Sequence, residues 1–158
     1  MSRLQDEFWE LASDIRVGLA TELARSESWS VKEVVLINRD QLKELFAPWY
    51  QTQNDFDVPF NAEGAVPVKI GDVLNNYRRW EKRHSRVDEI RCSLQTNDVS
   101  LTILGFCLPC DGTLLLDGNH RIIALAQTEY RFRLRVLVLD GPINPAVLPD
   151  LQHWITRS

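Results

Sequence analysis

The stretch at residues 114–127, LLLDGNHRIIALAQ, decides the fold of this chain. Three leucines end in Asp-Gly-Asn-His-Arg, and an apolar helical pattern starts at once. Gly118 permits a sharp backbone turn and the close approach of a ligand. Asn119 is a favoured helix N-cap, so we predict a helix from Arg121 to Gln127. The stretch therefore predicts a buried strand that turns directly into a helix.

The polar residues of this turn point to an anion site. A helix N-terminus presents free N–H groups and a partial positive charge. Arg121 adds a planar fork that matches phosphate or carboxylate. His120 can donate to an oxygen or move a proton, and Asp117 can bind a metal, orient the histidine or accept a hydroxyl proton. The predicted phosphate-binding residues are Gly118, Asn119, His120 and Arg121. The predicted catalytic residues are Asp117 and His120.

The alternative interpretation of the turn is structural. Asp-Gly-Asn is also a strong turn signal. In that case Asp117 caps the helix, His120 only begins it, and Arg121 pairs with a surface acid. The turn follows a buried strand and opens an apolar helix, which favours the anion site.

Periodicity predicts the elements around this turn. Apolar residues at steps of three or four indicate helices, and alternation or β-branched residues indicate strands. The predicted helices are 3–25, 41–46, 70–84 and 121–127. The predicted strands are 31–37, 90–94, 101–108, 113–116 and 131–139. Asp40 is the expected N-cap of the second helix, and Pro48 is expected to stop it.

The segment LTILGFCLPCDGTLLLDGNHRIIALA, followed by RFRLRVLVL, resembles the core of the ParB/sulfiredoxin superfamily. That core runs strand, short turn, strand, a G-x-H-R or G-x-R-R turn into a helix, and a further strand. The match covers residues 101–139, and VKEVVLINRDQLKELF more loosely resembles the opening strand and helix of the family. The resemblance implies an α+β fold with a small mixed sheet and packed helices, to which this chain adds an N-terminal helix.

The same resemblance implies nucleotide chemistry. In relatives the turn binds nucleotide phosphates. Family activities include ATP-dependent reduction of cysteine sulfinic acid, phosphorylation of free serine by a nucleotide donor, and CTP hydrolysis. Sulfiredoxins have a cysteine where this chain has Asn119, so we expect no sulfinic acid reduction. ParB proteins also carry a helix-turn-helix DNA-binding domain, for which the stretch after Leu139 is too short.

Composition argues against several other classes. The 18 Lys and Arg residues are outnumbered by 22 Asp and Glu, whereas DNA-backbone binding depends on a basic excess. No apolar run approaches the roughly 20 residues of a membrane span, and MSRLQDEFWE lacks the apolar region of a signal peptide. Three cysteines are an odd number and do not suggest a disulfide scaffold. We expect a cytoplasmic protein that binds neither DNA nor membrane.

Cys107 and Cys110 form a C-x-x-C pattern, with Cys92 and His120 as further candidate ligands. A zinc site needs about four ligands in a tetrahedral array. Because no second C-x-x-C or paired histidine accompanies the first, we predict no metal there.

Two basic groups remain. Arg131, Arg133 and Arg135 share one strand face, as a solvated face or as a basic rim beside the turn. A second set is expected to offset the negative end of a helix dipole. The alternative is that these residues form a basic patch that binds a partner. It comprises Arg78, Arg79, Lys82 and Arg83.

Residues 48–68 show no clear periodicity and are predicted to form a long loop. Such loops often act as lids over functional sites. Trp49 and Tyr50 could stack on a nucleobase, and Asp55 and Asp57 could hold Mg²⁺ or a cationic substrate. The alternative is that the aromatic residues only attach the loop to the core.

Together these observations predict a single domain over residues 1–158. It has an N-terminal helical segment at about 1–30, a core at about 31–140 and a Pro-rich tail at 141–158. We expect a ParB-like protein that binds ATP or another nucleotide with Mg²⁺ and acts on a small molecule as a phosphotransferase or NTPase. The alternative is a non-catalytic interaction protein of the regulatory or immunity type, with a protein partner.

Overall fold

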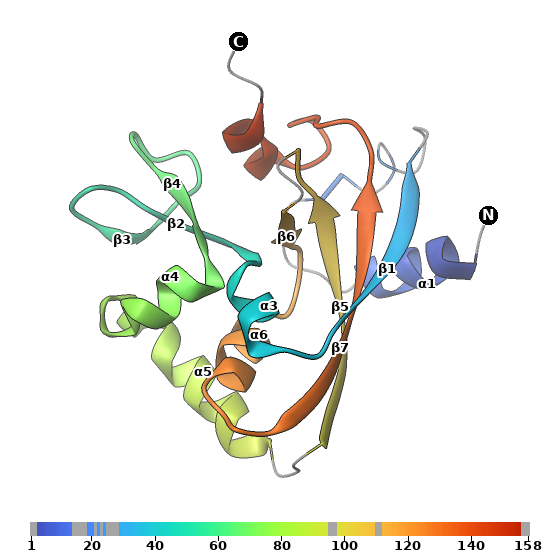
Figure 1. Ribbon diagram of the computed structural model, residues 1–158. Coiled ribbons are helices and arrows are strands. Elements are labelled where there is room, and N and C mark those ends of the chain that lie inside the picture. The colour runs from blue at the N-terminus through green and yellow to red at the C-terminus, as the bar shows by residue number, and fades with distance from the viewer. Residues whose placement is uncertain are drawn as a thin grey trace.

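The computed structural model shows one mixed seven-stranded sheet with helices packed on it (Figure 1), which confirms the predicted α+β class. The described residues are 3–13, 19–20, 22, 24, 29–94, 98–109 and 112–155. The described α-helices are α1 (Arg3–Ala12), α3 (Arg39–Lys43), α4 (Ile70–Asn75), α5 (Glu81–Ser93) and α6 (Asn119–Ala126). The 3-10 helices are η1 (Tyr77–Trp80) and η2 (Pro149–Trp154). None of the helices in these residues is long and apolar enough to cross a bilayer.

The strands follow the order β1-β7-β5-β6-β2-β3, and β4 also pairs with β2. Their bounds are β1 (Ser30–Leu36), β2 (Phe46–Gln51), β3 (Phe56–Val58), β4 (Val66–Lys69), β5 (Asp98–Cys107), β6 (Thr113–Leu115) and β7 (Arg131–Asp140). β5 and β7 pair in parallel along nearly their whole length, whereas β1 and β6 run antiparallel to β7 and β5. β6 then pairs in parallel with β2 at Phe46 and Leu114. The turn after β6 therefore lies where the long strands meet the β2–β4 region.

The central strands are buried on both faces of the sheet. Side chains alternate between the two faces of a strand. On β7, Leu134 and Val136 join the apolar cluster under α3, α4, α5 and α6, while Leu137 and Leu139 join the cluster under α1 and the C-terminal segment. This two-sided burial explains why the sequence of β7 shows its strand pattern so clearly.

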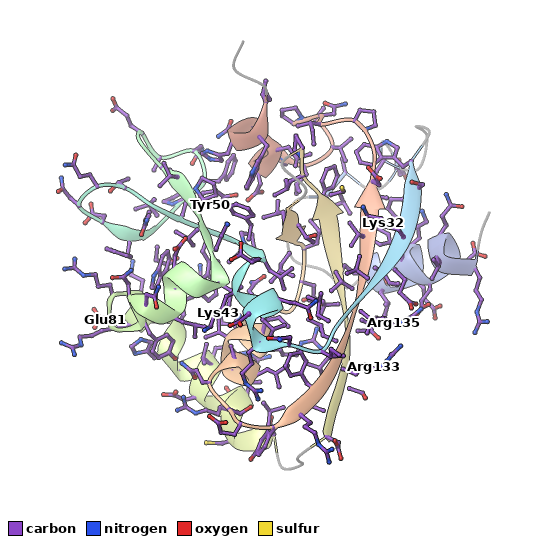
Figure 2. All side chains as sticks on the ribbon, in the orientation of Figure 1. Lys32, Lys43, Tyr50, Glu81, Arg133 and Arg135 are labelled. Atoms are coloured by element: carbon purple, nitrogen blue, oxygen red, sulfur yellow. The ribbon has the colours of Figure 1, made fainter. Side chains whose placement is uncertain are left out.

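The arginines at the start of β7 lie on the α1 side of the sheet. Arg131 and Arg133 are exposed, which confirms the predicted solvated face for both. Arg135 is only 22% exposed: its Nη atoms donate to the carboxylate of Glu7 on α1, and its Nε donates to Glu33 Oε2 at 2.6 Å. Figure 2 labels Arg133 and Arg135 on this strand. Arg135 thus joins α1 to β1 and β7.

The prediction of one continuous helix over 3–25 is wrong. α1 ends at Ala12, and Leu19 and Ala20 have no regular structure. The Ala20 N–H donates to Val147 O at 2.7 Å, so the chain has left the helix to join the C-terminal segment. The predicted positions Ile15 and Leu23 lie outside the described residues.

The short helix after β1 begins and ends earlier than predicted. Asn38, rather than Asp40, is the N-cap: its side chain accepts from the Asp40 N–H at 2.8 Å, and Gln41 completes a capping box. α3 ends at Lys43, and Pro48 lies inside β2 instead of stopping the helix.

Residues 48–68 are not an unstructured loop, because they contain most of β2, all of β3 and most of β4. The strands are short and irregular. Their register shifts between Ala47 and Tyr50, where Pro48 lies, and again between Tyr50 and Gln51. A bulge is a position where a strand tolerates proline. Pro48 therefore lies within a strand and does not mark the end of regular structure.

The predicted strand at 90–94 is instead the end of α5. The apparent alternation of Ile90, Cys92 and Leu94 hides a helical spacing. Val87, Ile90 and Leu94 pack against the core at steps of three and four, and Cys92 is exposed. The helix predicted over 70–84 is divided into α4, η1 and the start of α5.

Candidate functional site

The turn between β6 and α6 is held by Gly118. Its φ is 81°, a left-handed conformation that favours glycine. A Cβ at this position would lie 2.8 Å from Ile103 Cγ2 on β5, so the backbone is pressed against the central strand. Gly118, and not Asn119 as predicted, is the N-cap, since Ile122 N donates to Gly118 O at 2.9 Å and Asn119 is the first helical residue.

Asp117 and Arg121 are joined across this turn. Asp117 Oδ1 accepts from the Gly118 N–H at 2.8 Å, and its Oδ2 lies 3.3 Å from Arg121 Nη2. The two side chains are 47% and 38% exposed. A solvent-exposed pair of this kind is weak, so an anionic ligand can compete for the guanidinium.

The predicted residues of the turn line a hollow of about 810 Å³. We call it the α5–α6 hollow, because its other wall is α5. Three arginines face it, Arg83 and Arg86 from α5 and Arg121 from α6, and Asp117 is its acid. The remaining lining residues are Ile90, Ser93, Leu94, Leu101, Leu116, Gly118, Asn119 and His120. The hollow therefore combines three arginine side chains with the N-terminus of α6, whose first amides have no partner within the helix.

A second hollow of about 520 Å³ adjoins the first. We call it the β2–η2 hollow. Its walls come from β2, β3, the segment after β3 and the start of η2. Its lining residues are Pro48, Trp49, Tyr50, Asp57, Val58, Pro59, Phe60, Arg83, Asn119, Pro149 and Asp150. Arg83 and Asn119 line both hollows, so the two adjoin at these side chains, and we refer to them together as the cleft.

Arg83 is fixed at the junction of the hollows. Its Nη2 donates to Asp57 Oδ1 at 2.7 Å, and its guanidinium lies 4.7 Å from the Trp49 ring centroid. Arg83 Nε and Asn119 Oδ1 are buried and have no hydrogen-bond partner among the described residues. A buried polar atom without a partner calls for an explanation, and a bound water or ion is one of those that apply in folded proteins.

The four predicted substrate-loop residues have different positions. Trp49 lines the β2–η2 hollow but is only 2% exposed, packed by Trp80 at 5.6 Å and by His120 at 5.2 Å between ring centroids. Tyr50 is equally buried. Both rings attach β2 to the core, as the alternative interpretation proposed. Asp57 belongs to the cleft, whereas Asp55 lies in the β2–β3 turn and lines neither hollow.

Tyr50 leads to residues that the sequence did not single out. Its hydroxyl donates to Asp150 Oδ2 on η2, and its ring stacks on His153 at 4.9 Å. Burial, reinforced by the Asp150 carboxylate, raises the pKa of Tyr50 far above its usual range, so the hydroxyl keeps its proton. Figure 2 labels Tyr50 on β2. No local pattern marks Asp150, because its partner is 100 residues away in the chain.

Arg83 and Arg86 were also missed as site residues. The sequence placed Arg83 in a basic group balancing a helix end, but Arg83 lies in the first turn of α5. Arg83, Arg86 and Ile90 recur at helical spacing and face the same hollow. That spacing was the available signal, and the predicted strand at 90–94 obscured it.

The C-x-x-C pattern is described only in part. Cys107 lies at the end of β5, with Lys32 Nζ 3.7 Å from its Sγ, and Cys110 lies outside the described residues. In the part of the chain that the structure describes, no three or more His, Cys, Asp and Glu side chains are grouped as ligands of one metal ion.

No protein-family model, curated protein or solved structure matches this chain. Function is therefore inferred from the geometry and charge of the cleft.

Proposed function

We propose that the chain binds the phosphates of a nucleotide or similar phosphate ester in the α5–α6 hollow. The observation that carries this proposal is the convergence of Arg83, Arg86 and Arg121 on one hollow at the N-terminus of α6. Arginine matches phosphate oxygens by paired hydrogen bonds, and a helix N-terminus adds amide donors. The resemblance of residues 101–139 to the ParB/sulfiredoxin core supports the same position, Gly118 to Arg121.

The proposal extends to phosphoryl transfer or hydrolysis. Phosphoryl transfer requires positioning and charge stabilisation rather than elaborate covalent chemistry. Arg121 would hold the phosphates, and His120 would stabilise developing charge. Asp117, already within the hollow, would bind Mg²⁺ or serve as the general base. Mg²⁺ commonly takes one or two carboxylates and completes its shell with phosphate oxygens and water, so a single protein carboxylate is compatible with it.

The rival proposal is a non-catalytic interaction protein on the same fold. A wide apolar patch over α1 would favour it. Of the described residues of α1, Leu11 is the large apolar side chain that is exposed, at 38%. The cleft offers more specific support than this surface. We further propose a reducing, cytoplasmic setting, consistent with the free thiols of Cys92 and Cys107.

The test is calorimetric titration of ATP, CTP and GTP, each with and without Mg²⁺, on the wild type and on Arg121→Ala. We expect Arg121→Ala to weaken nucleotide binding by about 1.5–3 kcal/mol, the range of a charge-assisted hydrogen bond. Arg133→Ala is the matched control, because Arg133 is exposed on β7 and lines neither hollow. Equal affinity of the wild type and Arg121→Ala would refute the assigned site.

A further inference from the structure

The β2–η2 hollow has a different chemical character from its neighbour. Its charged lining residues are Asp57, Asp150 and Arg83. Arg83 is paired with Asp57 at 2.7 Å, so these two charges offset each other. Asp150 forms no ion pair with any described residue, and its described partner is the Tyr50 hydroxyl, which keeps its proton. One negative charge is therefore left over on the wall of the hollow.

Acceptor atoms also line the hollow, although several of its backbone carbonyls are already engaged. Three of its lining residues are Pro48, Pro59 and Pro149. Proline contributes a carbonyl acceptor but no N–H donor. The neighbouring Phe60 O already accepts from His153 Nε2 at 2.7 Å, which fixes that segment against η2. Pro59 O is likewise engaged, by the Ala62 N–H at 3.0 Å, whereas Asn119 Oδ1 lines the hollow, is buried and has no described partner, so it can accept from a ligand.

We propose that the β2–η2 hollow is a subsite for a cationic amino group, carried by a small molecule that shares the cleft with the phosphate ester. An ammonium group has three donors and no acceptor, which complements a wall of this kind. Asp150 supplies the charge, and Phe60 with the proline rings supplies apolar contact for a short carbon chain. This proposal rests on the proposed function, which supplies the phosphate ester in the neighbouring α5–α6 hollow.

A metal ion suits this hollow less well than an organic cation. Hard metal ions need several oxygen ligands around one point. One of the two carboxylates, Asp57, already binds a guanidinium, and Asp150 is engaged by Tyr50 through one oxygen. A single remaining carboxylate oxygen is enough for an ammonium group.

The test separates the two halves of the cleft. Binding of n-butylamine, which is protonated at neutral pH, is followed by NMR titration and compared with its neutral analogue 1-butanol. ATP binding is measured in parallel by calorimetry. We expect n-butylamine to shift the amide signals around Phe60 and Asp150 and to bind about tenfold more tightly than 1-butanol, as a charge-assisted contact requires.

Asp150→Asn is the decisive variant, because asparagine has nearly the same volume and can still accept from Tyr50. We expect it to weaken n-butylamine binding about tenfold and to leave ATP affinity within about twofold. Asp55→Asn is the control, since Asp55 is exposed nearby but lines neither hollow. If Asp55→Asn binds n-butylamine as tightly as the wild type does, the result supports the subsite.

The outcomes distinguish the two proposals. If ATP binds but n-butylamine and 1-butanol bind alike, or Asp150→Asn binds n-butylamine as the wild type does, the amino-group subsite is overturned and the phosphate site stands. If n-butylamine binds through Asp150 and no nucleotide binds, the proposed function is overturned while the amino-group subsite stands by itself.

Discussion

The guanidinium of Arg83 stacks over the indole of Trp49 at 4.7 Å while its Nη2 binds Asp57 at 2.7 Å. Three segments that are distant in the sequence, β2, β3 and α5, are thereby fixed around one side chain. Asp57 has a φ of 59°, an unusual value for a residue other than glycine. Backbone strain of this kind tends to occur at functional sites.

The Arg83–Asp57 pair should contribute measurably to stability. We expect a double-mutant cycle of Arg83→Ala and Asp57→Ala, measured by urea unfolding, to give a coupling energy of about 1–3 kcal/mol, because the pair is well shielded from solvent. Asp57 is only 12% exposed. The Arg86–Glu89 pair on the same helix is the control: its atoms are 3.7 Å apart and well exposed, so its coupling should stay below about 0.5 kcal/mol. Additive single effects at Arg83 and Asp57 would contradict the prediction.

Gly118→Ala should be strongly destabilising. Alanine would have to adopt the left-handed conformation, and its Cβ would meet Ile103. We expect a loss of about 2–4 kcal/mol in the free energy of unfolding, from strain and overpacking together. Gly64→Ala isolates the strain, because Gly64 has a φ of 76° but open space around its Cβ position. It should cost only about 1–2 kcal/mol. Equal losses in the two variants would show that the contact with Ile103 is unimportant.

The ion pair between Glu7 and Arg135 predicts a pH dependence of stability. The hydrogen bond from Arg135 lowers the pKa of Glu7 below its ordinary value of 4.5. A lowered pKa in the folded state means that the contribution is complete above about pH 5 and is lost as the pH falls through the folded-state pKa. The free energy of unfolding, measured in urea between about pH 3 and 6, should therefore fall as the pH is lowered. It should fall less in Glu7→Gln than in the wild type.

Glu10→Gln is the control for this pH dependence, because Glu10 is an exposed residue of the same helix. It should retain the decline seen in the wild type. If Glu7→Gln and Glu10→Gln give the same pH profile as the wild type, Glu7 does not couple α1 to the sheet through its charge.

Asp117→Asn tests the catalytic part of the proposed function. Asparagine can still accept from the Gly118 N–H, so the turn should be preserved. It cannot act as a base or bring a full negative charge to Mg²⁺. Nucleotide affinity should change little, while turnover, followed as phosphate release or by mass spectrometry of small-molecule products, should fall about 100-fold or more. Asp55→Asn should turn over normally. Turnover by Asp117→Asn at the wild-type rate would remove Asp117 from the mechanism.

The sequence predicted the region around β5, β6, α6 and β7 well, because its strands are buried and their apolar runs follow the period of each element. It failed at β2, β3 and β4, whose short and bulged strands depend on distant partners, such as Phe46 with Leu114. It also took the end of α5 for a strand, because Ile90, Cys92 and Leu94 happen to alternate. Local patterns cannot reveal pairing that only the folded sheet creates.

The candidate site divides in the same way. Residues 117–121 were found because their chemistry is contiguous at a strand-to-helix turn. The sequence pattern placed Arg83 at a helix end and did not mark Asp150 as a site residue. Each of them reaches the cleft from a separate element, α5 and η2. The buried positions of Trp49 and Tyr50 also followed from tertiary packing rather than from their sequence neighbours.

The contact of Gly118 with Ile103 has a further consequence for ligand binding. The turn packs closely on the Ile103 side chain of a central strand, which leaves it little room to move. The donors at the start of α6 are therefore already oriented before a ligand arrives. Binding there should require little loss of backbone conformational entropy, and the backbone of the turn should have the same conformation in the free and bound forms.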